Sequence, residues 1–299
     1  MQLERHGLTT DPIMTVMLGL EPLQVGLMFW TGGDLGVEAP PAEIATSVSS
    51  LGVSCGQLGV HGECPLDDAT ANRWKAVLDE HGLTVVTVVM CFSGEDYASI
   101  PICAQTVGYV PPSTRHEREV RTYAVSDFAR TLGVPGLAAH IGFVPADPLA
   151  AEYAAMVALM RRICDHCQTN GQTFAMETGQ ESPQEMLDFI AAVNRPNLRV
   201  NFDPANMVLY GSGAPLEALD ALRDHVLTVH CKDGTWPEVA GEWGRETPLG
   251  DGDVGMDQFV TKLQEIGYTG PLTIEREIVG EEQRADIRRA IDLLTALRA

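Results

Sequence analysis

Four apolar segments in the second half of the chain each end in an ionisable residue. They are residues 173–176 followed by Glu177, 198–202 followed by Asp203, 228–229 followed by His230, and 272–274 followed by Glu275. Burying an unpaired carboxylate costs several kcal/mol, so packing alone does not explain four such ends. We therefore expect a positive charge to lie between these four side chains.

From residue 23 onward the chain repeats one pattern: a short β-rich apolar run, a polar loop and a segment with helical periodicity. This pattern is typical of parallel βα units. The expected strands are 23–29, 53–58, 83–90, 137–141, 173–177, 198–203, 228–234 and 272–275. The expected helices are 41–51, 67–80, 114–132, 148–169, 183–193, 215–225, 256–266 and 281–297. This alternation predicts an α/β protein with a single (β/α)8 TIM barrel over residues 1–299, in which residues 1–22 form an N-terminal arm.

The competing architecture is an open, doubly wound sheet, which would carry a Gly-rich phosphate turn after an early strand. Gly26, Gly32 and Gly33 do not form the G-x-G-x-x-G pattern of that turn. The barrel is therefore the favoured fold. A segment rich in Gly, Pro and aromatic residues at 91–112 interrupts the repeat, and loops of this length are usually functional or mobile.

The charge balance restricts the partners of the protein. Asp and Glu number 41 against 20 Lys and Arg, and the net charge of -21 opposes binding to nucleic acid. No apolar stretch reaches the roughly 20 residues of a membrane helix, and the N-terminus lacks the order of a signal peptide. We expect a cytoplasmic protein with no membrane partner.

The cysteines indicate reduced thiols and not a disulfide framework, because they are 7 in number and irregularly spaced. Cys164-Asp-His-Cys167 has the spacing of a zinc or redox motif. It lies within a helical pattern, however, and has no second pair. We expect both cysteines to be ordinary helix residues.

The ionisable strand ends define a candidate metal site. The carboxyl ends of all strands in a barrel face one mouth, so these four side chains are expected to converge there. Three carboxylates and one imidazole suit one divalent ion, with Mn expected first and Co, Mg or Zn as alternatives. The competing interpretation is that a loop amide or a lysine satisfies each residue separately. This interpretation could account for any single residue of the four, but it does not readily account for four such residues on consecutive strands.

Short motifs around these residues resemble one protein family. They are Glu177-Thr-Gly179, Asn201-Phe-Asp-Pro-Ala-Asn206, Val229-His-Cys-Lys-Asp233, Pro248-Leu-Gly-Asp-Gly-Asp-Val254 and Gly270-Pro-Leu-Thr-Ile-Glu275. In them the chain is similar to the sugar-phosphate isomerase/epimerase family of the xylose-isomerase-like barrel superfamily. The resemblance implies a one-metal site with ligands Glu177, Asp203, His230 and Glu275. It also implies that Glu177 and Glu275 move protons on opposite faces of a bound sugar.

The expected reaction follows from this site. A metal bound to a carbonyl and an adjacent hydroxyl acidifies the neighbouring carbon and stabilises the enediolate that forms. Two flanking carboxylates can then remove and return a proton. We expect a metal-dependent isomerase or epimerase of a sugar or sugar derivative. A lyase or dehydratase that acts on a keto-sugar or keto-inositol through the same enolate is the alternative, and a binding barrel without catalysis is a third hypothesis.

The chain departs from the best-known members of this superfamily. Ketose 3-epimerases and inosose dehydratases carry a His three residues after the metal Asp, where this chain has Asn206. Ketose epimerases also place a substrate Arg shortly after the metal His, where this chain has Lys232 and Asp233. The three-zinc endonucleases need a His-rich cluster that the sequence lacks. The substrate therefore stays open between a free ketose, a phosphate ester and a cyclitol.

A set of polar and aromatic residues near the strand ends is expected to contact substrate: His140, Asn206, Lys232, Arg245, Trp30 and His61. Arg245 is the candidate for binding a phosphate or carboxylate group. Plainer interpretations exist for three of them. His140 can be a buried histidine bonded to a carboxylate, His61 a solvated loop residue, and Lys232 a charge partner for Glu177 or Asp233.

Two further features near the mouth are less specific. Trp236 and Trp243 can form apolar walls against a sugar ring, although aromatic loop residues also pack on each other. Gly250-Asp251-Gly252-Asp253 lacks the spacing of a calcium loop and is expected to be a turn, with Asp251 reaching toward the metal ligands. The expected partner is a small carbohydrate. Barrels of this kind often self-associate, so a homo-oligomer is an open expectation.

Overall fold

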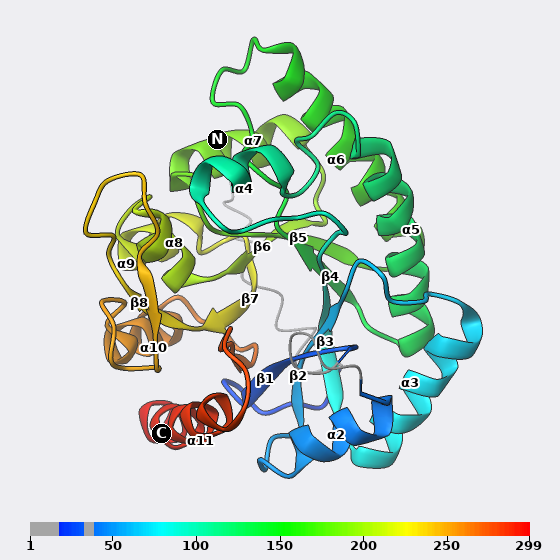
Figure 1. The fold of residues 1–299 in the computed structure, drawn as a ribbon, viewed down its shortest axis with the longest axis vertical. Helices are drawn as coiled ribbons and strands as arrows, with labels where there is room; N and C mark the ends of the chain where they lie inside the picture. Colours follow the sequence, from blue (N-terminus) through cyan, green and yellow to red (C-terminus); the bar gives the residue numbers. More distant parts are fainter. Residues whose placement is uncertain (1–17, 33–38) are drawn as a thin grey trace, which may run out of the picture.

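A closed barrel of parallel strands forms the centre of the computed structural model, which describes residues 18–32 and 39–299. The strands are β1 (Val25–Trp30), β2 (Cys55–Val60), β3 (Thr84–Met90), β4 (Gly136–Ala139), β5 (Thr173–Glu177), β6 (Leu198–Phe202), β7 (Val226–Cys231) and β10 (Leu272–Ile274). Neighbours in the barrel are neighbours in the chain, and β10 closes the ring by pairing with β1. Figure 1 looks into this ring of strands. The predicted TIM barrel is confirmed, while residues 1–17 of the predicted arm and Gly33 lie outside the described residues.

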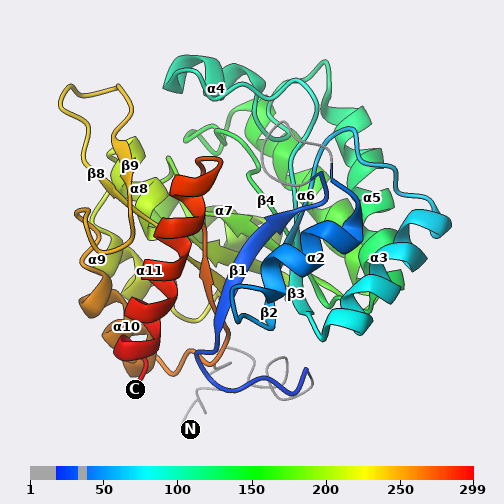
Figure 2. The same cartoon turned by 60° about the horizontal axis from the view of Figure 1, so that its bottom comes forward.

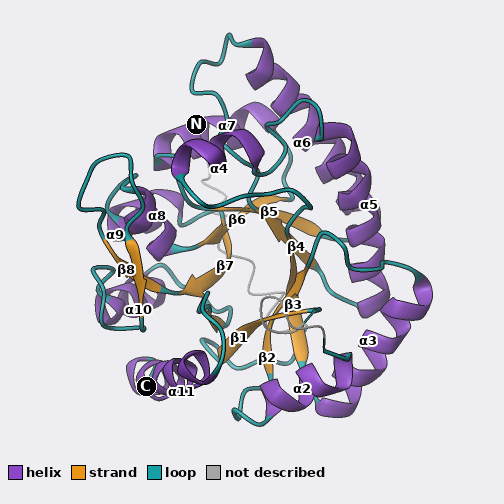
Figure 3. Cartoon of the chain, viewed as in Figure 1, coloured by secondary structure: helices purple, strands orange, loops and turns teal. Residues whose placement is uncertain are grey.

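The predicted helices are all present and surround the strands, as Figure 3 shows. They are α2 (Pro41–Ser49), α3 (Asp68–His81), α5 (Arg115–Leu132), α6 (Ala151–Thr169), α7 (Pro183–Val193), α9 (Pro215–Leu222), α10 (Met256–Glu265) and α11 (Glu281–Leu297). Side-chain caps set several starts: Asp67 accepts a hydrogen bond from the Thr70 backbone before α3, and Ser182 and Glu185 form a capping box at α7. Within the described ranges, no helix combines the length and the apolar character needed to cross a membrane.

Short elements at the mouth were not predicted. They are α4 (Ile100–Thr106), α8 (Pro204–Tyr210), and the antiparallel pair β8 (Asp233–Thr235) and β9 (Arg245–Thr247). Elements of three to seven residues are too short to produce a clear hydrophobic period. In Figure 2, α4 and the β8–β9 pair lie at the upper end of the barrel, away from the C-terminus at the bottom.

The long segment 91–112 was predicted as a loop, but it contains α4 and is tied to the barrel by two charged residues, the partly buried Glu95 and the buried Arg118. The Glu95 carboxylate accepts hydrogen bonds from the backbone N–H groups of Phe92, at 3.0 Å, and Gly108, at 2.8 Å. From α5, Arg118 donates to the carbonyl oxygen of Thr106 at 2.7 Å. These contacts fix the segment against the mouth, where it brings Tyr97 to the cavity described below.

The interior of the barrel changes from apolar to polar. An apolar cluster inside the strands consists of Met28, Val89, Ala138, Ala175 and Leu227. Polar side chains with no exposed surface share the strands with it: Gln57, Asn201, Thr228 and Thr273. Buried polar groups usually have hydrogen-bond partners. These four polar side chains form a polar layer inside the barrel, and packing alone does not explain it.

Candidate metal centre and active site

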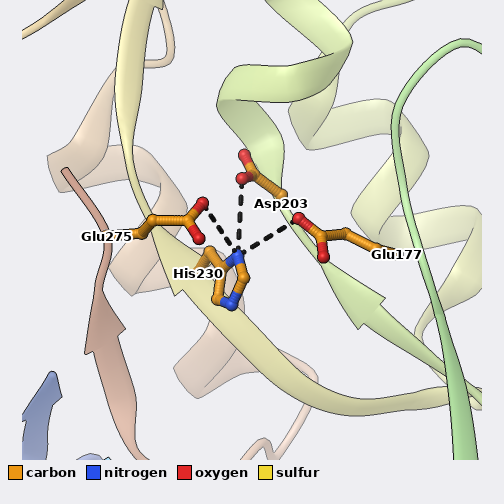
Figure 4. Close-up of side chains that lie close together, drawn as sticks. All are labelled: Glu177, Asp203, His230 and Glu275. Carbon is orange, nitrogen blue, oxygen red and sulfur yellow. Dashed lines mark ion pairs between the residues drawn. The ribbon is translucent and has the colours of Figure 1, made fainter. Parts of the chain in front are cut away.

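The four residues predicted as metal ligands lie together at the carboxyl ends of their strands. Glu177 ends β5, Asp203 and Glu275 directly follow β6 and β10, and His230 lies within β7. All four are buried, and one ligand atom of each lies within 4.8 Å of the others. His230 Nδ1 is 3.4 Å from Glu177 Oε1, 3.5 Å from Asp203 Oδ2 and 3.2 Å from Glu275 Oε2. Figure 4 shows Glu177 and Glu275 on opposite sides of this nitrogen.

Two of these atoms are buried without a hydrogen-bond partner among the described residues, namely Asp203 Oδ2 and His230 Nδ1. The other oxygen of Asp203 caps α8 by accepting a hydrogen bond of 2.9 Å from the Asn206 backbone N–H. Unpaired buried polar atoms are rare in folded proteins and call for a partner. Three carboxylates and an imidazole are a suitable donor set for a divalent cation, so these residues fit one metal ion.

The polar layer inside the barrel orients His230. Its Nε2 atom lies 3.2 Å from Gln57 Oε1 and can donate a hydrogen bond to that oxygen, which directs Nδ1 to the carboxylates and would leave it as the metal-ligating nitrogen. Asn201 also lies 3.2 Å from Nε2, and its own side-chain oxygen accepts a 2.7 Å hydrogen bond from Thr228. Gln57 and Asn201 were missed as site residues. A polar residue inside an apolar strand was the signal for each.

The charges at the site favour a cation. Burial opposes the charged imidazole, but the carboxylates of Glu275 and Glu177 outweigh burial and hold the pKa of His230 well above its ordinary value. Burial also raises the pKa of Glu275, yet His230 and Lys232 outweigh it, so that pKa lies well below its ordinary value. The carboxylate therefore stays ionised at neutral pH. A metal ion bound at this position would displace the proton of His230.

Lys232 lies beside the ligands and has only 1% of its surface exposed. Its Nζ atom is 3.1 Å from Glu275 Oε2, 2.7 Å from Glu277 Oε2 and 3.2 Å from Asn206 Oδ1. The charge partners considered from the sequence, Glu177 and Asp233, are not the ones it contacts. Carboxylates that follow β10 take that role.

A cavity of about 480 Å³ opens above the candidate metal site. Glu177 and Glu275 line it, and so do four of the predicted substrate residues: Trp30, His61, His140 and Asn206. Trp30 and His61 stack with ring centroids 4.7 Å apart. The Nε2 atom of His140 lies 3.6 Å from Glu177 Oε1 and the side chain is partly exposed, whereas the plainer interpretation expected a buried histidine bonded to a carboxylate.

The other two predicted substrate residues do not line the cavity. Arg245 is exposed on β9, and Lys232 is buried behind Glu275 and Asn206. Of the two loop tryptophans, Trp243 lines the cavity and packs against Tyr210 at 4.4 Å, while Trp236 is 40% exposed. Tyr210 lies on α8, which sequence analysis missed.

The structure corrects the expectation for Asp251. It lies on the surface, 3.1 Å from Arg289, and does not reach the metal ligands. The residue that organises this turn is Asp233, whose buried carboxylate accepts four backbone hydrogen bonds, from Gly234, Gly250, Gly252 and Val254. Each carboxylate oxygen thus accepts two hydrogen bonds in the turn, and Asp233 is a structural residue.

The Cys164-x-x-Cys167 motif lies within α6, as expected, and both cysteines are buried free thiols. Burial raises the pKa of Cys167 to about 12, so its thiolate is scarce at neutral pH. The remaining cysteines are also free. The structure therefore gives this motif no redox or zinc role.

The family model of the xylose isomerase-like TIM barrel matches residues 46–297, and the chain belongs to this family. The xylose isomerase domain protein of Planctomyces limnophilus is 42% identical and has a TM-score of 0.86, covering 93% of this chain and 98% of that chain. The D-psicose 3-epimerase of Clostridium cellulolyticum H10, solved with D-tagatose, is 17% identical and has a TM-score of 0.68 over 92% of this chain and 99% of that chain. At this lower identity the likeness shows the fold alone.

A curated relative, the L-ribulose 3-epimerase of Methylomonas sp. (strain DH-1), is 30% identical over 146 residues. The match covers 45% of this chain and 46% of the relative, so it spans about half the length of each. The family resemblance found in the sequence motifs is thereby confirmed.

Proposed function

We propose that the protein is a divalent-metal-dependent isomerase or epimerase of a small sugar or sugar derivative. The observation that carries the proposal is the position of Glu177 and Glu275, which approach His230 from opposite sides and both line the cavity. Relatives named as L-ribulose 3-epimerase and D-psicose 3-epimerase support sugars as the substrate class.

The metal, held by Glu177, Asp203, His230 and Glu275, would supply positive charge beside the substrate oxygens and so acidify the adjacent carbon. One glutamate accepts the proton of that carbon, the electron pair moves toward the carbonyl, and the sugar becomes an enediolate. Return of a proton to the same carbon from the other side gives the epimer. Its return to the former carbonyl carbon, while the proton of the neighbouring hydroxyl passes to the former carbonyl oxygen, gives the isomer.

The finer assignments belong to the same proposal. Manganese is the metal that we propose, because three oxygens and one nitrogen form a hard to borderline ligand set, with Co, Mg and Zn as alternatives. Trp30, His61 and His140 are the proposed sugar contacts, since they line the cavity beside Glu177. We also propose a cytoplasmic location, which the free state of the cysteines supports.

Solvent deuterium exchange tests the reaction. Metal-loaded protein is incubated in D₂O with a set of ketoses, and NMR follows deuterium at each carbon. We expect exchange at a carbon next to the carbonyl, and we expect Glu177→Gln and Glu275→Gln to slow it by about 100- to 10,000-fold. The metal content of each variant separates loss of the metal from loss of proton transfer.

The matched control is Glu217→Gln on the exposed face of α9, which should keep the full rate. Absence of exchange in every ketose, or a full rate in both glutamine variants of the site, would contradict the proposal. Release of water or of an aglycone would instead assign the protein to the lyase class considered from the sequence.

A further inference from the structure

Asn206 and Lys232 join the two glutamates of the site through a continuous chain of hydrogen bonds. We infer that both are positioning residues, which hold Glu177 and Glu275 at a fixed separation and do not bind substrate directly. The inference rests on the proposed function, because it takes these two glutamates as the groups that exchange protons. It gives Asn206 and Lys232 a role different from the substrate contacts expected from the sequence.

The hydrogen-bonding capacity of Lys232 is fully used within the protein. A lysine ammonium has three N–H groups. Three acceptors surround it, namely Glu275 Oε2 at 3.1 Å, Glu277 Oε2 at 2.7 Å and Asn206 Oδ1 at 3.2 Å. The side chain is 1% exposed and does not line the cavity. Its donors are therefore directed to the protein and not to a ligand in the cavity.

Asn206 completes the connection to the second glutamate. Its amide oxygen accepts the hydrogen bond from Lys232, which directs its NH₂ group to the opposite side. There it donates to Glu177 Oε1 at 3.2 Å, and it is 3.3 Å from the carbonyl oxygen of Thr178. The backbone of Asn206 is fixed as well, since its N–H donates to the metal-ligand candidate Asp203. The order of contacts is Glu275, Lys232, Asn206, Glu177.

This chain of hydrogen bonds would hold the two glutamates in position for proton transfer. The buried carboxylates of Glu177 and Glu275 repel each other. A carboxylate that rotates away from the reacting carbon transfers the proton more slowly. The ammonium of Lys232 lies 3.7 Å from Asp203 as well as 3.1 Å from Glu275, so it offsets part of that repulsion. Asn206 is uncharged, and its hydrogen bond from Lys232 and its hydrogen bond to Glu177 link the two residues. The sugar then meets two carboxylates whose positions are already set.

Kinetics of single and double variants test the inference. The variants are Lys232→Met, Asn206→Leu and the double variant, each measured with the metal-loaded protein on the ketose that exchanges deuterium. Positioning predicts that kcat falls at least tenfold in each single variant while KM stays within about twofold. It also predicts that the double variant is no slower than the slower single variant, because both substitutions break one unit.

Lys262→Met on α10 is the matched control, because Lys262 also pairs with carboxylates, at 3.1 Å from Glu265 and 3.6 Å from Asp220. It lies on an outer helix and does not line the cavity. This substitution should leave kcat unchanged. Asn206→Leu alters no charge, so it keeps the test decisive if Lys232→Met does not fold. A rise in KM at unchanged kcat would mean direct substrate binding and would overturn the inference, and so would an unchanged kcat.

A second readout does not need turnover. Urea unfolding of the metal-free protein gives the free energies of a thermodynamic cycle. Its members are wild type, both single variants and the double variant. A connected pair predicts that the second substitution costs little once the first is present. Additive free-energy changes would overturn the connection even if no sugar reacts. If wild type exchanges deuterium while the variants keep kcat, the inference fails and the proposed function stands.

Discussion

Oδ2 of Asp203 and Nδ1 of His230 lie 3.5 Å apart, and neither has a hydrogen-bond partner among the described residues. The two residues come from neighbouring strands, β6 and β7, so the fold itself brings the atoms together. The two oxygens of Asp203 have different roles, because the other oxygen caps α8. Removing the cap and removing the metal ligand are therefore separate experiments.

Asp203→Asn separates these two roles. The amide oxygen can still accept the hydrogen bond from the Asn206 backbone, but the negative charge that faces His230 is lost. We expect the affinity for Mn²⁺ to fall at least about tenfold, whereas the free energy of unfolding of the metal-free protein changes by less than about 1 kcal/mol. Titration calorimetry on metal-free protein measures the affinity.

Asp251→Asn is the control for that experiment, because Asp251 is exposed and pairs only with Arg289 among the described residues. Wild type saturated with Mn²⁺ at about 100 times its Kd should gain about 2.7 kcal/mol of stability. Equal affinities of the Asp203 and Asp251 variants would contradict a metal site at the strand ends.

The meeting of the four candidate ligands could be predicted because barrel geometry converts sequence position into spatial position. Glu177, Asp203, His230 and Glu275 each follow an apolar run, and the carboxyl ends of parallel strands meet at one mouth. The same rule says nothing about which side chains touch around them. For that reason the fold and the convergence of the four candidate ligands were predicted, but the partners of Lys232 were not.

Contacts between loops and distant elements escaped prediction for a physical reason. One partner of Lys232 is Glu277, 45 residues away, and no local period links the two. By contrast, α8 carried a readable signal, since Asp203 and Pro204 are an N-cap and first-turn pair. Tyr97 carried none, because its place at the cavity depends on Glu95 and Arg118 holding an irregular segment.

Asp233→Ala should destabilise the turn that follows β7. Its carboxylate accepts hydrogen bonds at 2.9 to 3.2 Å from the backbone of Gly234, Gly250, Gly252 and Val254. Loss of these charge-assisted bonds leaves the N–H groups of the buried Gly234 and Val254 unpaired, so the free energy of unfolding should fall by about 3 kcal/mol or more. Urea unfolding measures it. Asp251→Ala in the same turn should change it by less than about 0.5 kcal/mol, and equal losses in the two variants would refute the role of Asp233.

Cys164 and Cys167 should resist thiol reagents in the folded protein. Both are buried, and burial raises the pKa of Cys167 to about 12, so at pH 8 only about one thiol in 10,000 is ionised. We expect Ellman's reagent at this pH to leave both unmodified, while the partly exposed Cys64 reacts. Denatured protein, in which all the cysteines should react, is the control. Rapid modification of Cys167, or its oxidation to a disulfide with Cys164, would restore the redox interpretation.

The ion pair between Glu119 and Arg162 should make stability depend on pH. Glu119, on α5, accepts hydrogen bonds from Arg162 at 2.6 and 2.9 Å, and these bonds lower the pKa of its carboxyl. A lowered pKa stabilises the folded state above the unfolded pKa, and this contribution disappears as the pH falls below about 4.5. Because Arg162 is half exposed, we expect Glu119→Gln to lose about 1 kcal/mol at neutral pH and less at about pH 3.5, which lies below the unfolded pKa. Urea unfolding at both pH values measures the difference, with Glu117→Gln, an exposed change on the same helix, as control. A loss that stays constant between the two pH values would show that the carboxylate charge does not stabilise this pair.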